Sequence, residues 1–440
     1  MPVIQTLYRS VLWRGLYYLS AFVVNVLIAR HFLSAASGNI YYISSIYSLV
    51  LIFISFSIES GIVYFSANNK LAMGKLLNFA LLWSLVTGLL LYGILFFFNN
   101  DLPAAINKPL LLVSSITFIC GNLLTTYCTG LFYAKHDFLT PNLLSLIINL
   151  ALIMLFPFTG HSLIAGITDD NFFYVYFISF LVQGIVLVIA IQAKYIHFKF
   201  EGFLTIAEFR LLFRYCATAY VANIIFFLLY RVDYWFVERY CTAEDLGNYI
   251  QVSKLAQLFF ILPTILASAV FPLTAAGQRD AVNRTLALIS RIILLAYSVA
   301  CFILILTGRW LFPFIFGNSF LGMYQPFLLL VPGILSLSCL YAITAYYAGK
   351  NRMMVNIKGS VLALIVIVVA NRIFTPVYGI NAAALISSIG YIIYQVYVLS
   401  VFKKEYKSAI SDFFIFRKTD LAELKNKLWL SNQTKNDQQQ

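Results

Sequence analysis

The chain has 440 residues, of which 61% are hydrophobic and 11% are charged, and its mean hydropathy is +0.86. Soluble globular chains carry about 25% charged residues, so this chain lacks the polar surface that a water-soluble body needs. The composition excludes a soluble enzyme, a nucleic-acid-binding domain and a disordered chain. The net charge of +13 is typical of basic loops on one side of a membrane. We therefore expect an all-α protein that crosses the membrane many times.

Twelve apolar segments approach the length of about 20 residues that a membrane-spanning helix needs. The expected helices cover residues 11–30, 40–66, 76–98, 110–134, 141–158, 172–193, 211–237, 247–272, 286–312, 324–348, 354–373 and 380–402. They divide the chain into an N-terminal six-helix lobe (1–193), a cytoplasmic linker (194–210), a C-terminal six-helix lobe (211–402) and a cytoplasmic tail (403–440).

Lysine and arginine residues are concentrated in every second connection of this arrangement. Placing the N-terminus inside puts most of the 30 basic residues in cytoplasmic segments, including the linker and the tail. This asymmetry sets the orientation by the positive-inside rule. We therefore expect both termini to be cytoplasmic.

The six cysteines and four histidines are scattered singly along the chain. No pair has the spacing of a metal site or a redox motif. No Ser/His/Asp constellation or paired carboxylate appears either. We therefore expect no metal, no cofactor and no enzymatic activity.

The two halves of the chain resemble each other. Residues 28–39 (IARHFLSAASGN) align without gaps with residues 237–248 (VERYCTAEDLGN), so that Gly38 matches Gly247. Because each half would contain an even number of helices, both would insert with the same orientation. Parallel repeats about an axis along the membrane normal are a transporter architecture, with the substrate site between the lobes near the midplane.

A set of short motifs stands out along the second half of the chain. In chain order the motifs are Tyr230–Val237, Leu246–Ile250, Lys254–Gln257, Phe271–Pro272, Gly349–Lys350 and Thr375–Ala384. Their order and spacing resemble those of the Wzx-type oligosaccharide flippases of the multidrug/oligosaccharidyl-lipid/polysaccharide exporter superfamily. The resemblance covers essentially the whole chain and is clearer in the second half.

The resemblance implies a flippase of the bacterial inner membrane. Such a protein moves undecaprenyl-pyrophosphate-linked oligosaccharide repeat units from the cytoplasmic to the periplasmic leaflet, for O-antigen, capsule or exopolysaccharide assembly. The expected partners are this anionic lipid-linked oligosaccharide and membrane lipids, with no nucleic acid. A polysaccharide polymerase, a chain-length regulator and a coupling cation are further partners that the resemblance leaves open.

Charged and amide side chains within the expected helices are the candidate cavity residues. A charge at the bilayer centre costs about 2.5–3.5 kcal/mol, so such residues usually face a cavity or each other. Arginine and lysine would attract the pyrophosphate, and amides would hydrogen-bond sugar hydroxyls. The candidates are Arg14, Asn25, Glu59, Arg231, Asp233, Lys254, Gln257 and Arg291.

Several of these candidates also have a structural interpretation. Arg231 and Asp233 could pair with a neighbouring helix or extend to the membrane surface. Arg291 could anchor a helix end, and Glu59 could be a pairing partner. Pro263 in the helix 247–272, and Pro332 with Gly333 in the helix 324–348, are candidate hinges for alternating access. Ordinary helix packing would equally account for these three residues.

Two other functions remain open from the sequence. A cation-coupled multidrug exporter of the same superfamily would need acidic residues in its cavity, whereas most charges within the expected helices are basic. A membrane polysaccharide polymerase or ligase would be expected to carry a large outer loop with catalytic residues, and the longest outer connection, roughly residues 159–171, is too short for one.

Overall fold

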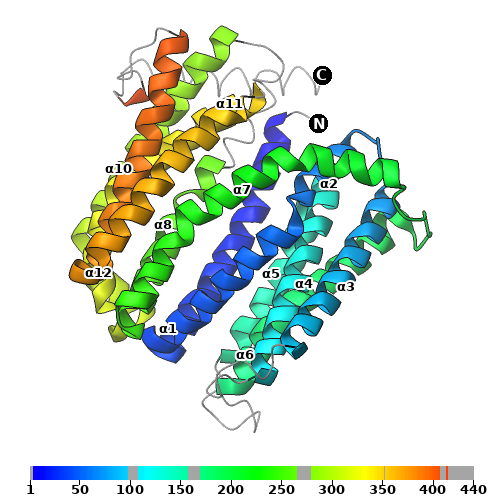
Figure 1. Ribbon diagram of the computed structural model, residues 1–440, viewed down its shortest axis with the longest axis horizontal. Helices are drawn as coiled ribbons and strands as arrows, with labels where there is room; N and C mark the ends of the chain where they lie inside the picture. The colour runs from blue at the N-terminus through cyan, green and yellow to red at the C-terminus, as the bar shows by residue number, and fades with distance from the viewer. Residues whose placement is uncertain are drawn as a thin grey trace, which may run out of the picture. The chain divides into compact units, whose positions relative to one another are not determined.

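The computed structural model describes residues 3–97, 108–156, 169–264, 279–350, 352–406 and 413–414. These residues form helices and contain no β-strand. The helices are α1 (Val3–Ser55), α2 (Ile58–Ala67), α3 (Met73–Phe97), α4 (Lys108–Ala134), α5 (Leu139–Leu155), α6 (Asp169–Ile191), α7 (Ile206–Tyr240), α8 (Ala243–Leu258), α10 (Arg279–Phe316), α11 (Tyr324–Gly349) and α12 (Met353–Tyr406), with the short segments η2 (Gln192–Ile196) and η3 (Asn318–Met323) (Figure 1).

The helices have the length and composition of membrane spans. Eight of those in the described residues are long and apolar enough to cross a membrane, and the shorter apolar helix α5 adds to them. Two of the eight each cover parts of two expected spans. The helical geometry is interrupted between those spans, at Leu33 within α1 and at Gly379 within α12. The chain is therefore an all-α, multi-pass membrane protein, and each of the twelve expected spans has a helical counterpart.

Two expected helices differ in detail from the structure. The span expected at 40–66 is broken, because Phe56 and Ser57 have positive φ angles of 47° and 54°. The span expected at 247–272 is interrupted after Leu258 by a turn at Phe259 and Phe260, and helical residues resume at 261–264. Pro263 supplies the reason, since it has no N–H for the carbonyl of Phe259 and its ring crowds that carbonyl. Residues 157–160, 271–272 and most of the tail lie outside the described residues.

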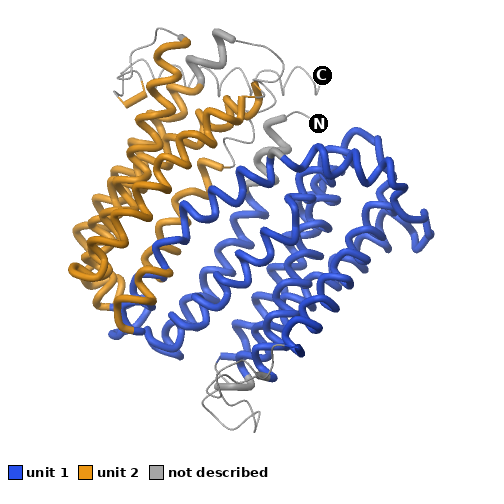
Figure 2. The backbone as a smooth tube through the Cα atoms, in the orientation of Figure 1, with its two compact units in different colours: residues 1–234, 243–250, 314–320 blue, residues 235–242, 251–313, 321–440 orange. Residues whose placement is uncertain are grey.

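The chain forms two compact units (Figure 2). Unit 1 comprises Met1–Tyr234, Ala243–Ile250 and Phe314–Phe320, and unit 2 comprises Trp235–Thr242, Gln251–Pro313 and Leu321–Gln440. These units do not coincide with the expected lobes, because most of α7 belongs to unit 1. The division into lobes at 1–193 and 211–402 stays a prediction.

Close packing of α4 against α6 builds the core of unit 1. A Cβ atom at Gly121 would lie 2.3 Å from the carbonyl carbon of Phe180, and one at Gly184 would lie 2.8 Å from Cβ of Leu124. Only glycine permits such an approach at Gly121, because backbone atoms cannot move aside as a flexible side chain can. Small residues are the usual means by which membrane helices approach closely.

The glycines that the internal repeat aligns lie against each other in unit 1. A Cβ atom at Gly38 would lie 2.6 Å from Cα of Gly247. One at Gly247 would lie 1.9 Å from the carbonyl oxygen of Ser34. Ser319 joins the two segments, because its hydroxyl accepts the Ser34 N–H at 3.1 Å and its carbonyl accepts the Asn248 amide at 3.1 Å. The repeated motif therefore forms a contact between its own two copies.

An ionic cluster fixes the connection between α4 and α5 to η2. The Asp137 carboxylate accepts hydrogen bonds from Lys194 Nζ at 2.8 Å and from the N–H and hydroxyl of Thr140 at 3.0 and 2.7 Å. Burial acts to raise the pKa of Asp137, but these hydrogen bonds outweigh burial and hold the pKa below its ordinary value. The acid also lies at the start of α5, where a negative charge is favoured.

We expect Gly247→Ala to destabilise the protein, because its methyl group would overlap the Ser34 carbonyl. Overpacking of this kind lowers the free energy of unfolding by roughly 1–3 kcal/mol. The matched control is Gly93→Ala, which would meet no atom within 4 Å and gains helix propensity. Thermal unfolding in detergent should show a lower midpoint for Gly247→Ala alone. Equal midpoints for the two variants would contradict the contact.

We expect Asp137→Asn to lower the unfolding midpoint by a few degrees at pH 7. Because folding depresses the pKa of Asp137, its stabilising effect is present above the unfolded pKa of about 3.9 and is lost as pH falls through the folded value. The difference between the variant and the unsubstituted protein should therefore shrink below about pH 4. Glu244→Gln, at an exposed acid, is the control. A difference that persists unchanged at pH 3 would exclude the ionised carboxylate as its source.

Candidate functional site

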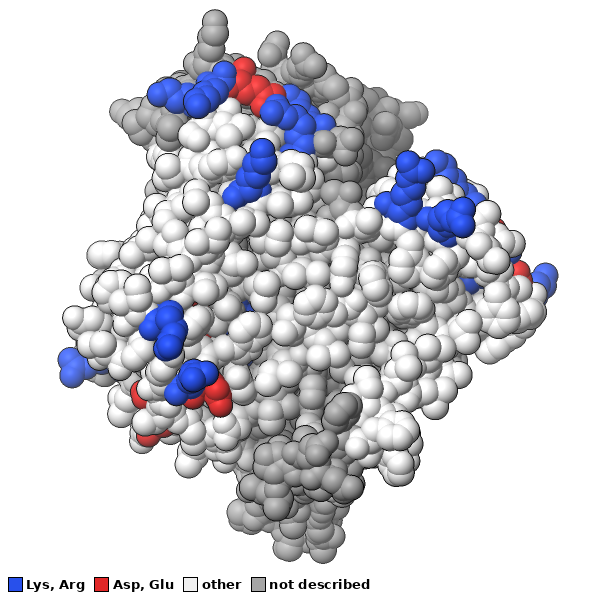
Figure 3. All heavy atoms as spheres, viewed as in Figure 1, with Lys and Arg blue, Asp and Glu red and all other residues white. Residues whose placement is uncertain are grey.

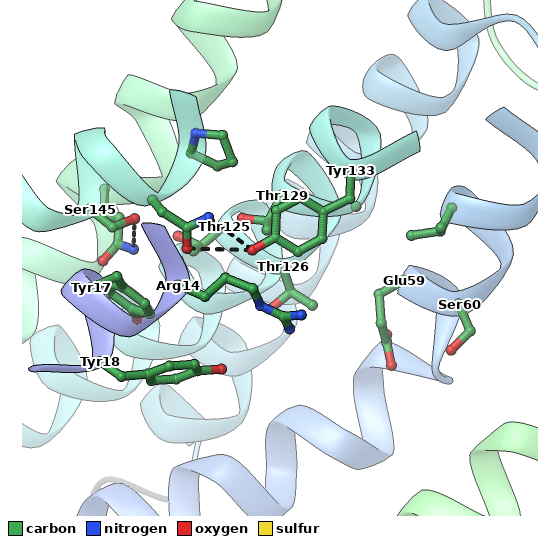
Figure 4. A pocket seen from close by; sticks show the side chains of 15 residues that line it. Arg14, Tyr17, Tyr18, Glu59, Ser60, Thr125, Thr126, Thr129, Tyr133 and Ser145 are labelled. Carbon is green, nitrogen blue, oxygen red and sulfur yellow. Dashed lines mark hydrogen bonds between the residues drawn. The ribbon is translucent and has the colours of Figure 1, made fainter. Parts of the chain in front are cut away.

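A cavity of about 370 Å³ lies within unit 1. Helices α1, α2, α4, α5 and α6 contribute its walls (Figure 4). Its volume is in the range of small-ligand pockets. The lining residues are Arg14, Tyr17, Tyr18, Glu59, Ser60, Val63, Thr125, Thr126, Thr129, Gly130, Tyr133, Pro141, Asn142, Ser145 and Gln183.

Arg14 supplies the positive charge of the cavity from α1. Its guanidinium carbon lies 5.2 Å from the centre of the Tyr133 ring, in a cation–π contact. Within the described part of the chain, Arg14 makes no ion pair. The tyrosines Tyr17 and Tyr18 follow one turn later on the same helix and place two more aromatic rings at the cavity. Arg14 is therefore held by aromatic contact, with its hydrogen-bond donors available to a ligand.

Glu59 supplies a negative charge from the wall formed by α2. Figure 4 shows the Arg14 and Glu59 side chains extending from different helices towards the same space. The Oε2 atom of Glu59 is buried and has no hydrogen-bond partner among the described residues. A buried oxygen without a partner is costly, so it is a strong candidate for contact with a ligand, an ion or a proton.

Neutral polar groups from α4, α5 and α6 complete the cavity. The Asn142 amide donates to the Tyr133 hydroxyl at 3.1 Å, and the Gln183 amide donates to the Ser145 hydroxyl at 2.6 Å. Three threonines, Thr125, Thr126 and Thr129, add hydroxyls from α4. These bonds orient the amides and hydroxyls before any ligand binds. A guanidinium group beside aromatic rings, amides and hydroxyls suits a ligand that is both anionic and rich in hydroxyls.

The structure brings together two of the eight candidate residues from the sequence. Arg14 and Glu59 line the cavity, whereas the other six are not among its lining residues. The placement of those six in a substrate cavity stays a prediction.

The contacts of three of these candidates are well defined. Arg231 lies against the Tyr234 ring, at 5.0 Å, and donates to its hydroxyl. The buried Asp233 carboxylate accepts the Tyr249 hydroxyl at 2.5 Å, joining α7 to α8. The Asn25 carbonyl accepts the Tyr41 hydroxyl at 3.1 Å. These contacts support a structural role for Asp233.

The remaining three candidates lie on α8 and α10. Lys254 and Gln257 are half-buried on α8. Arg291 is buried, and α10 begins at Arg279, so Arg291 lies about three turns inside its helix rather than near the helix end. The candidate span within α10 begins at Leu286, five residues before Arg291, so the anchoring role considered for Arg291 stays a prediction.

The candidate hinge in α11 contains a hydroxyl bridge. The helix continues through Pro332, which leaves a carbonyl one turn earlier without its usual donor. At the next residue, the Gly333 N–H donates to Ser388 Oγ at 3.2 Å. The Ser388 hydroxyl in turn donates to the Leu329 carbonyl, four residues before Gly333, at 2.5 Å. Ser388 of α12 therefore links the two ends of one turn of α11. The role of Pro332 and Gly333 as a hinge stays a prediction, as does that of Pro263.

Sequence reasoning based on charge missed the neutral part of the cavity. Gln183, Asn142 and Ser145 lie in the expected spans 141–158 and 172–193, which contain no charged residue that would single them out. A stripe of uncharged polar residues at helical spacing was the available signal, since Thr126, Thr129 and Tyr133 follow each other on one face of α4.

Comparison with known protein families identifies the family of the chain. The sequence model described as "Polysaccharide biosynthesis protein" matches residues 27–325, which is most of the chain. The chain belongs to this polysaccharide biosynthesis family. No curated protein matches its sequence.

Solved structures identify the fold of this family member. The lipid II flippase MurJ, in an inward closed conformation, has a TM-score of 0.70 and 18% identity over 92% of this chain and 89% of its own. The MATE transporter VcmN of Vibrio cholerae, in its bent form, has a TM-score of 0.64 and 14% identity over 93% of this chain and 98% of its own.

A third similar structure is a MOP superfamily transporter from Pyrococcus furiosus. Its TM-score is 0.64, with 13% identity over 91% of this chain and 94% of its own. At these identities the similarity establishes the fold and not the substrate. The family match and this fold agree with the resemblance to the exporter superfamily. The similar structures are those of transporters and a flippase.

Proposed function

We propose that the protein is a flippase for an undecaprenyl-pyrophosphate-linked oligosaccharide in the bacterial inner membrane. It carries the head group from the cytoplasmic to the periplasmic leaflet during polysaccharide biosynthesis. Both termini are cytoplasmic in this proposal, as the distribution of basic residues favours. The polysaccharide family and the exporter fold support the proposal, and the chemistry of the unit 1 cavity is consistent with it.

The arrangement of Arg14 carries the proposal. Its guanidinium group lies in a cavity with hydroxyl and amide groups, and it makes no ion pair within the described part of the chain. A pyrophosphate can accept the forked donors of arginine, while hydroxyls and amides bind sugar rings. The cavity would thus bind the region where the pyrophosphate joins the oligosaccharide.

The membrane potential favours the outward direction of transport. A pyrophosphate diester carries about two negative charges, and moving one charge through 100 mV is worth about 2.3 kcal/mol. Because the cell interior is negative, outward movement of the head group gains about 5 kcal/mol per 100 mV when no other ion moves with it. Arg14 would neutralise part of this charge during passage, so the head group need not enter hydrocarbon as a bare anion.

One observation favours a second function, a cation-coupled exporter of organic cations. Glu59 lines the same cavity and has a buried oxygen without a partner. A carboxylate in this state could bind an organic cation or the coupling cation. The predominance of neutral polar groups around it, and the presence of Arg14, weigh against a cationic substrate.

We expect Arg14→Ala to reduce surface polysaccharide about tenfold to a hundredfold when the gene complements a flippase-null strain. A hydrogen bond to a charged group is worth about 1.5–3 kcal/mol, which corresponds to this range. Arg14→Lys should restore only part of the output, because lysine lacks the forked geometry. Arg30→Ala, at an exposed arginine on the same helix, is the control. Full output from Arg14→Ala at an unchanged protein level would refute the role of Arg14.

We expect Glu59→Gln to separate the two functions. For the flippase, the neutral amide keeps the shape of the cavity and leaves at least a third of the polysaccharide output. For an exporter of organic cations, the same change abolishes cation-stimulated transport in proteoliposomes. Ethidium efflux by the unsubstituted protein, lost in Glu59→Gln, would favour the exporter over the flippase.

A further inference from the structure

The linker between η2 and α7 presents large apolar side chains to the surroundings. Phe198, Phe200, Phe203 and Ile206 are 71%, 72%, 54% and 80% exposed. They lie beyond the end of the candidate span that finishes at Ile196 and before the one that begins at Ala219. Apolar groups at such a density would be unfavourable in water, so the surface they form is expected to be covered.

Polar contacts from the linker point in one direction, towards α3. The Glu201 carboxylate accepts the Gly74 N–H at 2.7 Å, at the start of α3. The Asn78 amide donates to the Gly202 carbonyl at 2.8 Å, and Lys75 pairs with Glu208 at 2.9 Å. These bonds fix the linker on the end of the bundle. The phenylalanines on either side of Glu201 are consequently held on the outside.

The first turns of α7 continue this surface. Figure 1 shows them lying across the ends of α2 and α3 rather than along these helices. Among the contacts that hold this segment are the ion pair of Glu208 with Lys75 and the packing of Leu212 on Gly61, where a Cβ atom would lie 2.6 Å from Leu212 Cδ1. Ring contacts of Phe209 with Phe79 and of Tyr215 with Tyr64 add to them. Leu211 and Tyr215 remain 49% and 43% exposed. These turns precede the candidate span of α7, which begins at Ala219.

Basic side chains surround the apolar groups. Lys199, Arg210 and Arg214 are exposed on the linker and α7, and Lys70 is exposed on the neighbouring connection. On the face drawn in Figure 3, a group of basic side chains lies at the end of unit 1 that carries the linker. Exposed aromatic groups beside lysine and arginine are the composition of segments that insert into the boundary between lipid headgroups and acyl chains.

We propose that residues 198–214 form a membrane anchor that inserts its phenylalanines into the adjacent leaflet and binds anionic phospholipid headgroups through Lys199, Arg210 and Arg214. The charge of these residues fits anionic lipid, and the position of the exposed apolar groups between the candidate spans Phe172–Ile196 and Ala219–Tyr240 fits a bilayer as the partner. The linker is therefore held at the membrane surface and fixed to unit 1, and it does not act as a free tether in the cytoplasm.

The test uses the full-length protein in nanodiscs of phosphatidylcholine and phosphatidylglycerol. A bimane label is placed at Phe200→Cys, with Asn69→Cys, in an exposed polar connection, as the matched control. The described native cysteines are buried, apart from the half-buried Cys241, so the unlabelled parent protein gives the background. Nitroxides placed shallow or deep in the acyl chains report the depth of the label.

Membrane insertion predicts blue-shifted emission and strong quenching by the shallow nitroxide at Phe200→Cys, with weak quenching at Asn69→Cys. Equal, aqueous emission at both positions would overturn the proposal. So would a label that is shielded only after a cytosolic protein fraction is added, because the surface would then bind protein.

A second measurement tests the basic residues separately. Nitroxide-labelled phosphatidylglycerol should quench the Phe200→Cys label more than nitroxide-labelled phosphatidylcholine does, by up to about fivefold for each basic side chain near the surface. The stronger quenching by phosphatidylglycerol should diminish in the Arg210→Gln/Arg214→Gln variant. High salt should diminish it in the protein that keeps both arginines. Equal quenching by the two lipids before any substitution would refute binding of anionic headgroups. Because none of these measurements involves transport, their outcome is independent of the proposed flippase activity.

Discussion

A chain that crosses hydrocarbon must satisfy its polar atoms with its own groups, and this constraint shapes the whole protein. The backbone meets it by forming helices, and many hydroxyls meet it within their own helix. Ser44 donates to the Ile40 carbonyl at 2.8 Å and Thr117 to the Val113 carbonyl at 2.6 Å. Polar groups that do not bond in this way are therefore informative. Several of them line the unit 1 cavity, where the Asn142 and Gln183 amides bond to hydroxyls.

The same constraint explains how the helices contact one another. Because lipid tails are as apolar as leucine, helices gain little from burying apolar surface and associate through close packing and hydrogen bonds. Gly121 allows the α4 backbone to approach α6, and Gly333 allows α11 to approach the Ser388 hydroxyl of α12. The second contact combines a tight approach with a helix turn weakened by Pro332.

Charge has two separate uses in this molecule. Near the ends of the helices, lysine and arginine occur close to exposed apolar rings, and the acids Asp137, Glu201 and Glu208 fix connections to helix ends. In the cavity, Arg14 and Glu59 occur without an ion pair among the described residues. Charges placed only near the helix ends would be compatible with a stable membrane protein. The second pattern costs stability, and binding an anionic ligand, a cation or a proton would recover it.

The amino-acid sequence determined the membrane class, the helices and the resemblance to polysaccharide exporters, because hydrocarbon admits few structures and apolar length is read directly from the chain. It also singled out Arg14 and Glu59, since charge within a span is rare. Only the tertiary structure decided that these two share a cavity with Gln183 and Asn142, because neutral polar residues are common on buried and exposed faces alike. The contact between Gly38 and Gly247 was likewise decided by tertiary structure: the repeat showed that the two glycines are equivalent, but their meeting depends on how distant helices pack.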